Sequence, residues 1–269
     1  MQSMLFVPGS KPDRFAKALA SGADCVCIDL EDAVPAEAKA EARGIAISAA
    51  ATNPRFAIRI NGLTTREGLA DLLALAESSH RPAMVFIPKV DAAHEIEIAR
   101  QVLADAAVAF VPLIETVKGL AAAPAIAAEA QVAMLMFGGG DFSTELGVEL
   151  AWEPLLVARS QLVMAAAGAG IPVMDVPFIR LDDADGLRVE TEKAKALGFT
   201  AKSAIHPAQI EAIHSVFRPS ATEIAEAHEA RAAFAAAGGA AVRFKGKMLE
   251  APFMRRYEQI IAIGEKINA

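Results

Sequence analysis

The sequence predicts a closed (β/α)8 barrel, a TIM barrel, with a C-terminal helical appendage. Two observations lead to this prediction: short apolar runs recur at near-regular intervals, and alanine-rich segments with helical spacing separate them. Because most of the runs are continuously apolar rather than alternating, they are typical of strands covered on both faces in a parallel sheet. The eight runs are Met4–Pro8, Cys25–Leu30, Phe56–Ile60, Met84–Pro88, Ala109–Ile114, Ala133–Phe137, Ile171–Val176 and Phe199–Ile205.

The segments between the runs predict the helices of the barrel. Glycines next to the last turn close several of them, as at Gly22, Gly168 and Gly198. Strand followed by helix, eight times in about 210 residues and without a cofactor fingerprint, favours a closed barrel over an open doubly wound sheet. The expected helices include Asp13–Ser21, Ala36–Ala51, Gly68–Ser78, Ala92–Ala104, Leu120–Ala130, Leu155–Ala167 and Gly186–Leu197.

The pattern changes after the eighth run, so we expect residues 1–217 to form the barrel and residues 218–269 the appendage. Ser220 and Glu223 stand at capping-box spacing and predict the start of a long helix. The appendage is interpreted as a lid or as an arm that packs on the barrel or on a neighbouring subunit. Its later elements are a short β-like piece at Ala241–Phe244 and a last helix from about Pro252 to Ile267.

Composition excludes several classes of protein. With 54% hydrophobic residues the chain has enough apolar material for a core, which excludes disorder. A formal net charge of −7 disfavours a broad face that binds nucleic acid. The only two cysteines, Cys25 and Cys27, lie in one apolar run, so we expect small buried hydrophobes rather than a disulfide scaffold.

A membrane protein is also disfavoured. The longest uncharged stretch of the apolar part, Ser160–Met174, is too short for a span of ~20 residues and contains two glycines and a proline. The N-terminus has neither the basic segment nor the long apolar core of a secretory signal. We therefore expect a cytoplasmic protein with no membrane and no nucleic-acid partner.

Polar side chains at the carboxyl ends of barrel strands converge on the active site. Here most of them are carboxylates. Such hard oxygen donors, without a convergent set of Cys or His, suit Mg²⁺ or Mn²⁺ rather than zinc. Taken singly, each carboxylate has an alternative role as the N-cap of the next helix. In chain order, the polar residues at strand ends are Lys11, Asp29, Glu31, Asp32, Arg59, Asn61, Lys89, Glu115, Asp141, Asp175, Lys202 and His206.

Glu115 and Asp141 follow adjacent predicted strands, so both can reach one ion. Three glycines, Gly138, Gly139 and Gly140, directly precede Asp141 and let an ion or a substrate approach the backbone closely. Arg59 is the natural partner of a substrate carboxylate, because its planar guanidinium can bind one bidentately. The alternative for Arg59 is a structural ion pair with a neighbouring carboxylate.

Seven segments, in order along nearly the whole chain, carry a family resemblance. They are Leu5–Gly9, Ser21–Asp24 leading into Ile28–Val34, Arg59–Asn61, Ile87–Val90, Leu113–Thr116, Phe137–Asp141 and Gly198–Pro207. In these segments the chain resembles the citrate lyase beta-subunit family within the HpcH/HpaI aldolase/citrate lyase superfamily. That family includes malyl-CoA and citramalyl-CoA lyases.

The resemblance implies a Mg²⁺-dependent carbon–carbon lyase that cleaves or forms citryl-, malyl- or citramalyl-CoA, with acetyl-CoA or a related acyl-CoA and an oxo-acid as the other side of the reaction. It implies Glu115 and Asp141 as metal ligands and Asp32 as the residue that holds a metal-bound water. It also implies substrate contacts for Arg59, Glu115, Gly138 and Gly139, and contacts with the phosphates of coenzyme A for Lys11, Arg14, Lys17 and Lys202.

One departure from the family pattern concerns the appendage. CoA-lyase members have a Met-Ile-Asp segment whose Asp reaches a neighbouring subunit's site as an acid/base. The matching stretch here is Met248-Leu249-Glu250, so Glu250 stands where Asp is expected. A role in trans requires at least a dimer, and the resemblance implies a homotrimer or hexamer.

Two other functions stay open at this point. The first is a metal-dependent class II aldolase acting on free oxo-acids, which dependence on a CoA thioester would exclude. The second is the beta subunit of a citrate lyase complex that works with an acyl-carrier partner, which activity of the isolated chain would exclude.

Overall fold

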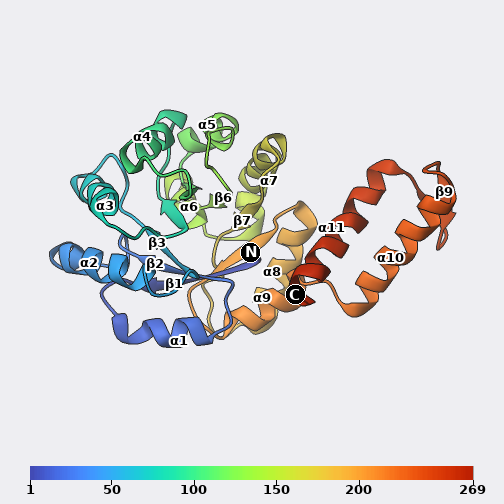
Figure 1. Cartoon of the computed structure of the whole chain (residues 1–269), viewed down its shortest axis with the longest axis horizontal. Coiled ribbons are helices and arrows are strands. Elements are labelled where there is room, and N and C mark those ends of the chain that lie inside the picture. Colours follow the sequence, from blue (N-terminus) through green and yellow to red (C-terminus); the bar gives the residue numbers. More distant parts are fainter. Residues whose placement is uncertain (269) are drawn as a thin grey trace. The chain divides into compact units, whose positions relative to one another are not determined.

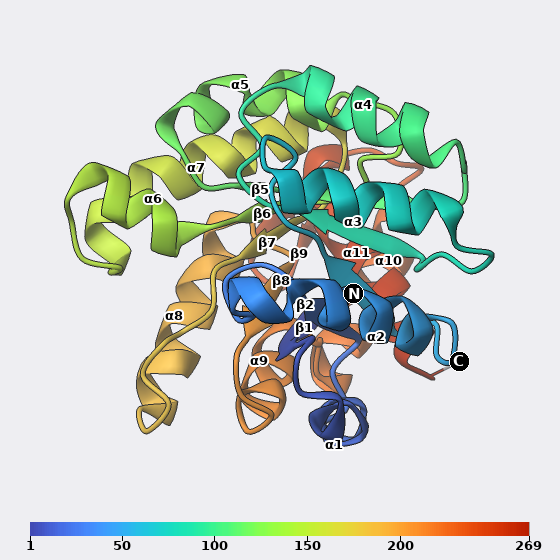
Figure 2. The same cartoon turned by 90° about the vertical axis from the view of Figure 1, so that its left-hand side faces the viewer.

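A computed structural model describes residues 1–268, with side chains described for residues 1–265. Eight parallel strands pair in chain order and the last closes on the first, so the predicted (β/α)8 barrel is confirmed (Figure 1). Figure 2 shows the strands at the centre of a ring of helices. The strands are β1 (Ser3–Pro8), β2 (Cys25–Asp29), β3 (Phe56–Arg59), β4 (Met84–Ile87), β5 (Ala109–Ile114), β6 (Leu135–Phe137), β7 (Val173–Asp175) and β8 (Ala201–Ala204).

The seven helices named from the sequence are present in the barrel, and three of them begin at a side-chain cap. Thr65, Thr116 and Asp183 each accept a hydrogen bond from the backbone N–H three residues on, so each begins a helix. The barrel helices are α1 (Phe15–Ala20), α2 (Lys39–Ala50), α3 (Arg66–Glu77), α4 (Ala93–Leu103), α5 (Val117–Ala127), α6 (Gly139–Leu146), α7 (Trp152–Ala169), α8 (Ala184–Leu197) and α9 (Gln209–Phe217).

Helix α6 was not predicted, because the sequence analysis placed residues 138–141 at a strand end and expected no helix directly after them. Glycine has a low helix propensity, so the three glycines give no sequence signal for the helix that begins there. The helix matters for the site because it puts Asp141 in its first turn.

The interior of the barrel is apolar and rich in sulfur-containing side chains. Residues on alternate positions of each strand point inward, and the sheet is closed, so these side chains meet in one cluster. Cys25 and Cys27 are free and buried in it, as expected. The cluster contains Met4, Cys25, Cys27, Ala57, Phe86, Val111, Leu113, Met134, Met136, Met174 and Ala201.

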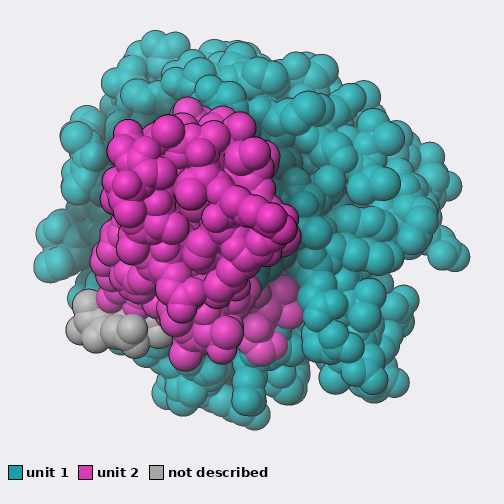
Figure 3. All heavy atoms as spheres, turned by 90° about the vertical axis from the view of Figure 1, so that its right-hand side faces the viewer, with its two compact units in different colours: residues 1–213 teal, residues 214–269 magenta. Residues whose placement is uncertain are grey.

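The remaining part of the chain, residues 214–269, forms a second compact unit, which Figure 3 colours separately from residues 1–213. Its first helix is capped by the predicted box, in which Ser220 and Glu223 bond each other's backbone N–H. Leu249 and Met254 are buried in its small core. Strand β10 was not predicted. The unit contains α10 (Ala221–Ala236), β9 (Val242–Phe244), β10 (Lys247–Leu249) and α11 (Ala251–Asn268).

No helix within the described residues combines the length and the apolar character that crossing a bilayer requires.

Candidate active site

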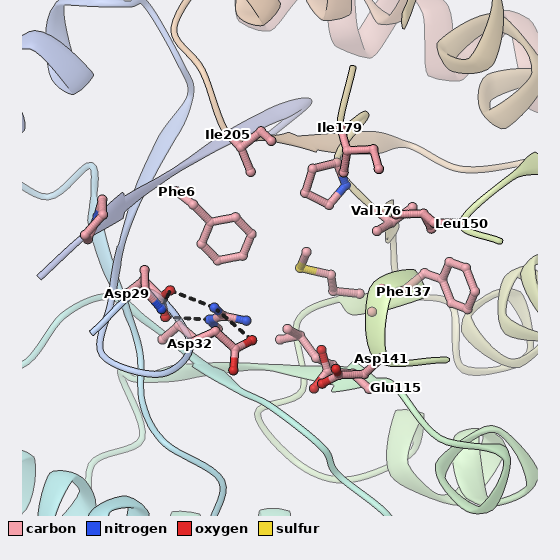
Figure 4. Close-up of a pocket in the computed structure, with 18 residues that line it drawn as sticks. Phe6, Asp29, Asp32, Glu115, Phe137, Asp141, Leu150, Val176, Ile179 and Ile205 are labelled. Carbon is pink, nitrogen blue, oxygen red and sulfur yellow. Dashed lines mark hydrogen bonds and ion pairs between the residues drawn. The ribbon is translucent and has the colours of Figure 1, made fainter. Parts of the chain in front are cut away.

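A pocket of about 490 Å³ lies at the carboxyl ends of the strands. Figure 4 shows Glu115 and Asp141 next to each other in this pocket, with Asp29 and Asp32 facing them. The pocket therefore combines an acidic patch with apolar walls. Its lining residues are Phe6, Pro8, Asp29, Asp32, Ala33, Arg59, Leu113, Glu115, Met136, Phe137, Gly138, Gly140, Asp141, Leu150, Val176, Pro177, Ile179 and Ile205.

Arg59 enters the pocket as half of a bidentate ion pair. Asp29 and Arg59 are register partners on β2 and β3, and both are in phase with inward residues of their strands. The guanidinium Nε and Nη2 donate to the two Asp29 carboxylate oxygens, each at 2.7 Å. The Phe6 ring covers the guanidinium at 4.8 Å. Arg59 therefore forms the structural ion pair that the sequence analysis gave as the alternative. The role of Arg59 toward a substrate stays a prediction.

Glu31 extends the acidic patch from the loop after β2. Its Oε2 lies 2.9 Å from Arg59 Nη1, yet this buried oxygen has no hydrogen-bond partner among the described residues. Burial raises the pKa of Glu31 above its ordinary value, although the charges of Arg59 and Lys89 oppose the shift. Asp32, one position further, is mostly exposed and stands 3.8 Å from Arg59 Nη2.

Glu115 follows β5 and is buried over a glycine. A Cβ on Gly138 would lie 2.1 Å from Glu115 Cγ and 2.3 Å from its Oε1, so only glycine leaves room for this carboxylate. Its Oε2 accepts a hydrogen bond of 2.8 Å from the backbone N–H of Lys89. Burial, together with the charge of Glu31, raises the pKa of Glu115 to about 8.

Lys89 was given no role by the sequence analysis, yet its ammonium lies in the acidic patch. Nζ is 2.7 Å from Glu31 Oε1, 2.9 Å from Asp141 Oδ2 and 3.9 Å from Asp32 Oδ1. Burial alone would lower the pKa of Lys89, but the bonds to Glu31 and Asp141 raise it above its ordinary value. Its place directly after an apolar run put Lys89 among the strand-end residues of the sequence analysis, without a role of its own.

Gly139 has a different position from the two glycines beside it. Gly138 and Gly140 line the pocket, and Gly139 is not among its lining residues. The space beside Gly139 is filled by side chains of Phe137, Leu150 and Val176. The substrate contact expected for Gly139 therefore stays a prediction, and Gly139 itself does not line the pocket.

A further residue that the sequence analysis missed supports the acidic loop from behind. The Lys39 ammonium donates to the carbonyl oxygens of Leu30 and Glu31 at 2.9 and 2.8 Å, and to Asn61 Oδ1 at 2.5 Å. Buried Asp71 holds the other side of Asn61 by accepting from its backbone N–H and its Nδ2. Lys39 thus fixes the loop that carries Glu31 and Asp32.

The prediction for Lys202 is wrong. This side chain is completely buried, and its Nζ binds Asp175 at 2.6 Å, Glu190 at 2.9 Å and the Val176 carbonyl at 2.8 Å. Lys202 is out of phase with inward Ala201, so it points to the layer of helices rather than into the pocket. Its ammonium has no access to the phosphates of coenzyme A.

The other predicted phosphate contacts lie at the surface near β1 and α1. Arg14 and Lys17 line a second pocket of about 370 Å³, together with His206. The two pockets share Phe6, Pro8 and Ile205 in their walls. Lys11 is exposed and is not among the residues that line either pocket. A basic pocket therefore adjoins the acidic one.

Glu250 lies in the second unit, between β10 and α11, and its side chain is exposed. Its suggested role as an acid/base in trans stays a prediction.

The donor set at Glu115 and Asp141 fits a hard divalent cation. Both are carboxylates, Gly138 provides the cradle for Glu115, and Glu31, whose buried Oε2 faces Arg59 without a hydrogen bond, adds a further carboxylate nearby. Within the part of the chain that the structure describes, no group of three or more Asp, Glu, His or Cys is arranged to enclose an ion. Two carboxylates with open positions are the arrangement that Mg²⁺ uses when water and substrate complete its coordination.

The barrel places a carboxylate pair and an arginine in one pocket at the carboxyl ends of its strands. A family model described as HpcH/HpaI aldolase/citrate lyase matches residues 2–207, and one described as C–C bond lyase of the TIM-barrel fold matches residues 161–264. The chain belongs to the HpcH/HpaI aldolase/citrate lyase family, a family of carbon–carbon lyases. The resemblance stated from the sequence is confirmed.

Individual relatives match over nearly the full length. The chain is 35% identical to a citrate lyase subunit beta-like protein of Deinococcus radiodurans, over 97% of this chain and 96% of that one. It is 34% identical to a (3S)-malyl-CoA thioesterase of Cereibacter sphaeroides, over 100% of this chain and 96% of the relative. The crystal structure of CitE from Mycobacterium tuberculosis with magnesium, acetoacetate and coenzyme A is similar at a TM-score of 0.84 and 30% identity, covering 98% of both chains.

Proposed function

We propose that the protein is a Mg²⁺-dependent lyase that cleaves or forms a carbon–carbon bond in a 3-hydroxyacyl-CoA thioester of the citryl, malyl or citramalyl type, with an acyl-CoA and an oxo-acid as the other side of the reaction. The observation that carries the proposal is the meeting of Glu115, Asp141 and Arg59 in one pocket at the strand ends. The ligands named with the Mycobacterium tuberculosis structure, namely magnesium, a short oxo-acid and coenzyme A, support the same three components here.

Glu115 and Asp141 would hold the cation. When bound, Mg²⁺ supplies Lewis-acid stabilisation of the charge that develops on the substrate oxygen. The residues around it fix the ion's surroundings: Gly138 keeps the Glu115 carboxylate in place, and Lys89 binds both carboxylates from the neighbouring loop. Asp32 is the candidate for holding a water at this centre.

Arg59 would orient the oxo-acid half. Nε and one Nη2 N–H serve Asp29, and Nη1 lies 2.9 Å from Glu31 Oε2, which leaves one N–H each of Nη1 and Nη2 for a substrate carboxylate. The bond to Asp29 and the Phe6 ring restrict the guanidinium to one orientation. A carboxylate bound there is held in a fixed place relative to Glu115, which lowers the entropic cost of reaching the transition state.

The shape of the two pockets suits a long thioester. The apolar walls around Leu113, Val176 and Ile205 exclude water from the reacting atoms, which strengthens the electrostatic interactions in the site. The adjoining pocket carries Arg14 and Lys17 and would take the phosphates of coenzyme A, with exposed Lys11 nearby in sequence. Since Ile205 belongs to both walls, an acyl-CoA can extend from one pocket into the other.

The reaction also needs proton transfers. A base takes the proton of the substrate hydroxyl during cleavage, and an acid protonates the enolate carbon of the departing acyl-CoA. Glu250, contributed by another subunit of a homotrimer or hexamer, is our candidate for this work. Its carboxylate has the chemistry of the expected Asp on an arm one methylene longer.

A second candidate function rests on a specific comparison. The full-length relative named as a (3S)-malyl-CoA thioesterase hydrolyses, by that name, the thioester bond rather than a carbon–carbon bond. The same pocket would hold such a substrate. The products separate the two activities, because a thioesterase releases free coenzyme A and the intact hydroxy acid.

The deciding experiment uses the purified chain with Mg²⁺ and citryl-, malyl-, methylmalyl- and citramalyl-CoA. We expect release of an acyl-CoA and an oxo-acid from at least one thioester, measured by chromatography and by a carbonyl reagent. Free thiol without oxo-acid would assign the thioesterase activity. Turnover of free hydroxy acids alone would assign a class II aldolase, and turnover only with an added acyl-carrier protein would assign a citrate lyase subunit.

The metal assignment is tested on the same substrate. Glu115→Gln and Asp141→Asn should each lower kcat/KM by about 100-fold or more, since a metal's charge stabilisation is worth several kcal/mol. They should also weaken Mg²⁺ binding in calorimetry. The matched control is Glu149→Gln, which removes an exposed carboxylate near α6 that does not line the pocket. Unchanged Mg²⁺ affinity in both site variants would disprove the metal assignment.

A further inference from the structure

Lys89 contacts both predicted metal ligands with different parts of one residue. Its backbone N–H donates to Glu115 Oε2 at 2.8 Å, and its ammonium lies 2.9 Å from Asp141 Oδ2. One oxygen of each carboxylate is therefore engaged by Lys89. Asp141 has no other ion-pair partner among the residues that the structure describes, so Lys89 is its counter-ion there.

The backbone at Lys89 is unusual. Its φ of +53° places it in the left-handed region, which is unfavourable for a residue with a Cβ. The residue directly follows Pro88 at the end of β4, and this conformation accompanies the contacts of its N–H and its side chain with the same acidic patch. Glycine would adopt this conformation at lower cost but would supply no charge. The position therefore combines backbone strain with a charged group.

The charges around Lys89 show what that group does. Among the described residues, the patch holds five carboxylates and two cations. The carboxylates are Asp29, Glu31, Asp32, Glu115 and Asp141, and the cations are Arg59 and Lys89. Arg59 is bound bidentately to Asp29, so it is committed to a fixed place. The Lys89 side chain is 43% exposed, its ammonium stands at the end of a flexible chain, and it is the cation that can move.

We propose that Lys89 is a tethered cation that occupies the place beside Asp141 in the metal-free protein and competes there with the divalent ion, so that it sets the ion affinity of the centre. Glu31 at 2.7 Å and Asp32 at 3.9 Å are the partners that its ammonium keeps when it gives up Asp141. The inference rests on the proposed function in one respect, namely that Glu115 and Asp141 hold the ion.

The test compares Mg²⁺ dissociation constants of the wild type and Lys89→Met by isothermal titration calorimetry at low ionic strength. We expect the variant to bind Mg²⁺ about tenfold more tightly, because a unit charge a few ångströms from a divalent ion has been removed. The gain should shrink as salt is added, since salt screens partly exposed charges. The metal-free variant should unfold at a lower denaturant concentration than the metal-free wild type, because its carboxylates lose their counter-ion.

Two control variants bracket this result. Lys89→Arg keeps the charge and should bind Mg²⁺ with nearly the wild-type affinity. Lys118→Met removes the same charge from an exposed side chain that pairs with Asp91 at 3.6 Å, and it should leave the affinity unchanged. Equal or weaker Mg²⁺ binding by Lys89→Met would overturn the inference, provided that the wild type binds Mg²⁺.

A wild-type measurement makes the test independent of how the variant folds. The rate at which acetic anhydride modifies Lys89, followed by peptide mass spectrometry, should rise when Mg²⁺ is added, because the ammonium is displaced from Asp141. Modification of Lys118 should not change. A Lys89 rate that is constant or falls with Mg²⁺ contradicts the competition. Failure of the wild type to bind Mg²⁺, or an undiminished affinity in Asp141→Asn, would instead reject the proposed function.

Discussion

Two ion pairs in the barrel are built in the same way and face different surroundings. Asp29 and Arg59 are register partners on β2 and β3, and Asp175 and Lys202 are register partners on β7 and β8. The first pair is in phase with the inward residues of its strands, and the second is out of phase with them. A single step along each strand therefore sends one pair into the pocket and the other into the layer of helices.

The pairs also differ in how completely their charge is matched. Around Asp175, the cations Arg159 and Lys202 meet the carboxylates Asp175 and Glu190, and the network is almost sealed from solvent. Burial alone would raise the pKa of Asp175, but the charges of Lys202 and Arg159 outweigh it and hold the pKa below its ordinary value. Among the described residues, the acidic patch at the pocket has more carboxylates than cations, and Glu31 Oε2 faces Arg59 without a hydrogen bond. The balanced network leaves an unpaired buried charge only when one partner is removed, whereas the unbalanced cluster is suited to receive a cation.

The largest effect is expected from breaking the sealed network. Lys202→Met leaves Asp175 with one cation and Glu190 without its buried partner, which should lower the free energy of unfolding by about 3–5 kcal/mol. Urea unfolding monitored by circular dichroism measures the change. The activity per folded molecule should stay near the wild-type value.

The control for this change is Lys193→Met on the same helix as Glu190. Lys193 pairs with exposed Glu153 at 3.5 Å, and such surface pairs contribute about 0–1 kcal/mol. Similar losses of stability in both variants would show that the buried network contributes no more to the free energy of unfolding than a surface ion pair.

An intermediate effect is expected in the pocket, on function rather than on stability. Gly138→Ala places a methyl group 2.1 Å from Glu115 Cγ, so the carboxylate must move. Because displacement of a catalytic group by about 1 Å can cost about 100-fold in rate, we expect a loss of that order in kcat/KM and weaker Mg²⁺ binding. Gly140→Ala is the matched control, since nothing lies within 4 Å of its added Cβ. Wild-type kcat/KM in both variants would mean that the site tolerates displacement of Glu115.

The same comparison explains which parts of the site could be predicted from the sequence. Continuous apolar runs locate strand ends, so Glu115, Asp141 and Arg59 were placed at one mouth of the barrel. The phosphate contact of Lys202 was implied by the resemblance, and the phase of Lys202 relative to inward Ala201 shows why the structure does not bear it out. Strand position alone is not enough, because a side chain that follows a strand can point to either layer.

Other features depend on information that local sequence does not carry. The positive φ of Lys89 aims an ordinary surface residue type at the carboxylates, and the residue itself gives no sign of it. Helix α6 forms despite its glycines because tertiary contacts override propensity. Lys39 reaches an amide on β3's loop, Asn61, from α2, so its role depends on the packing of separate elements.

The smallest effect is expected behind the acidic loop, where a cation binds neutral acceptors. The ammonium of Lys39 meets two carbonyls and an amide, so its loss leaves dipoles rather than charges unpaired. Lys39→Met should therefore cost about 1 kcal/mol of stability. It should raise KM by about fivefold, because Glu31 and with it Arg59 would be held less firmly, whereas Mg²⁺ affinity should remain unchanged. Lys39→Arg, which restores donors at this position, should recover most of the KM. If Lys39→Met weakened Mg²⁺ binding as strongly as Gly138→Ala, the loop and the metal ligands would form one coupled unit rather than separate orienting and ion-binding groups.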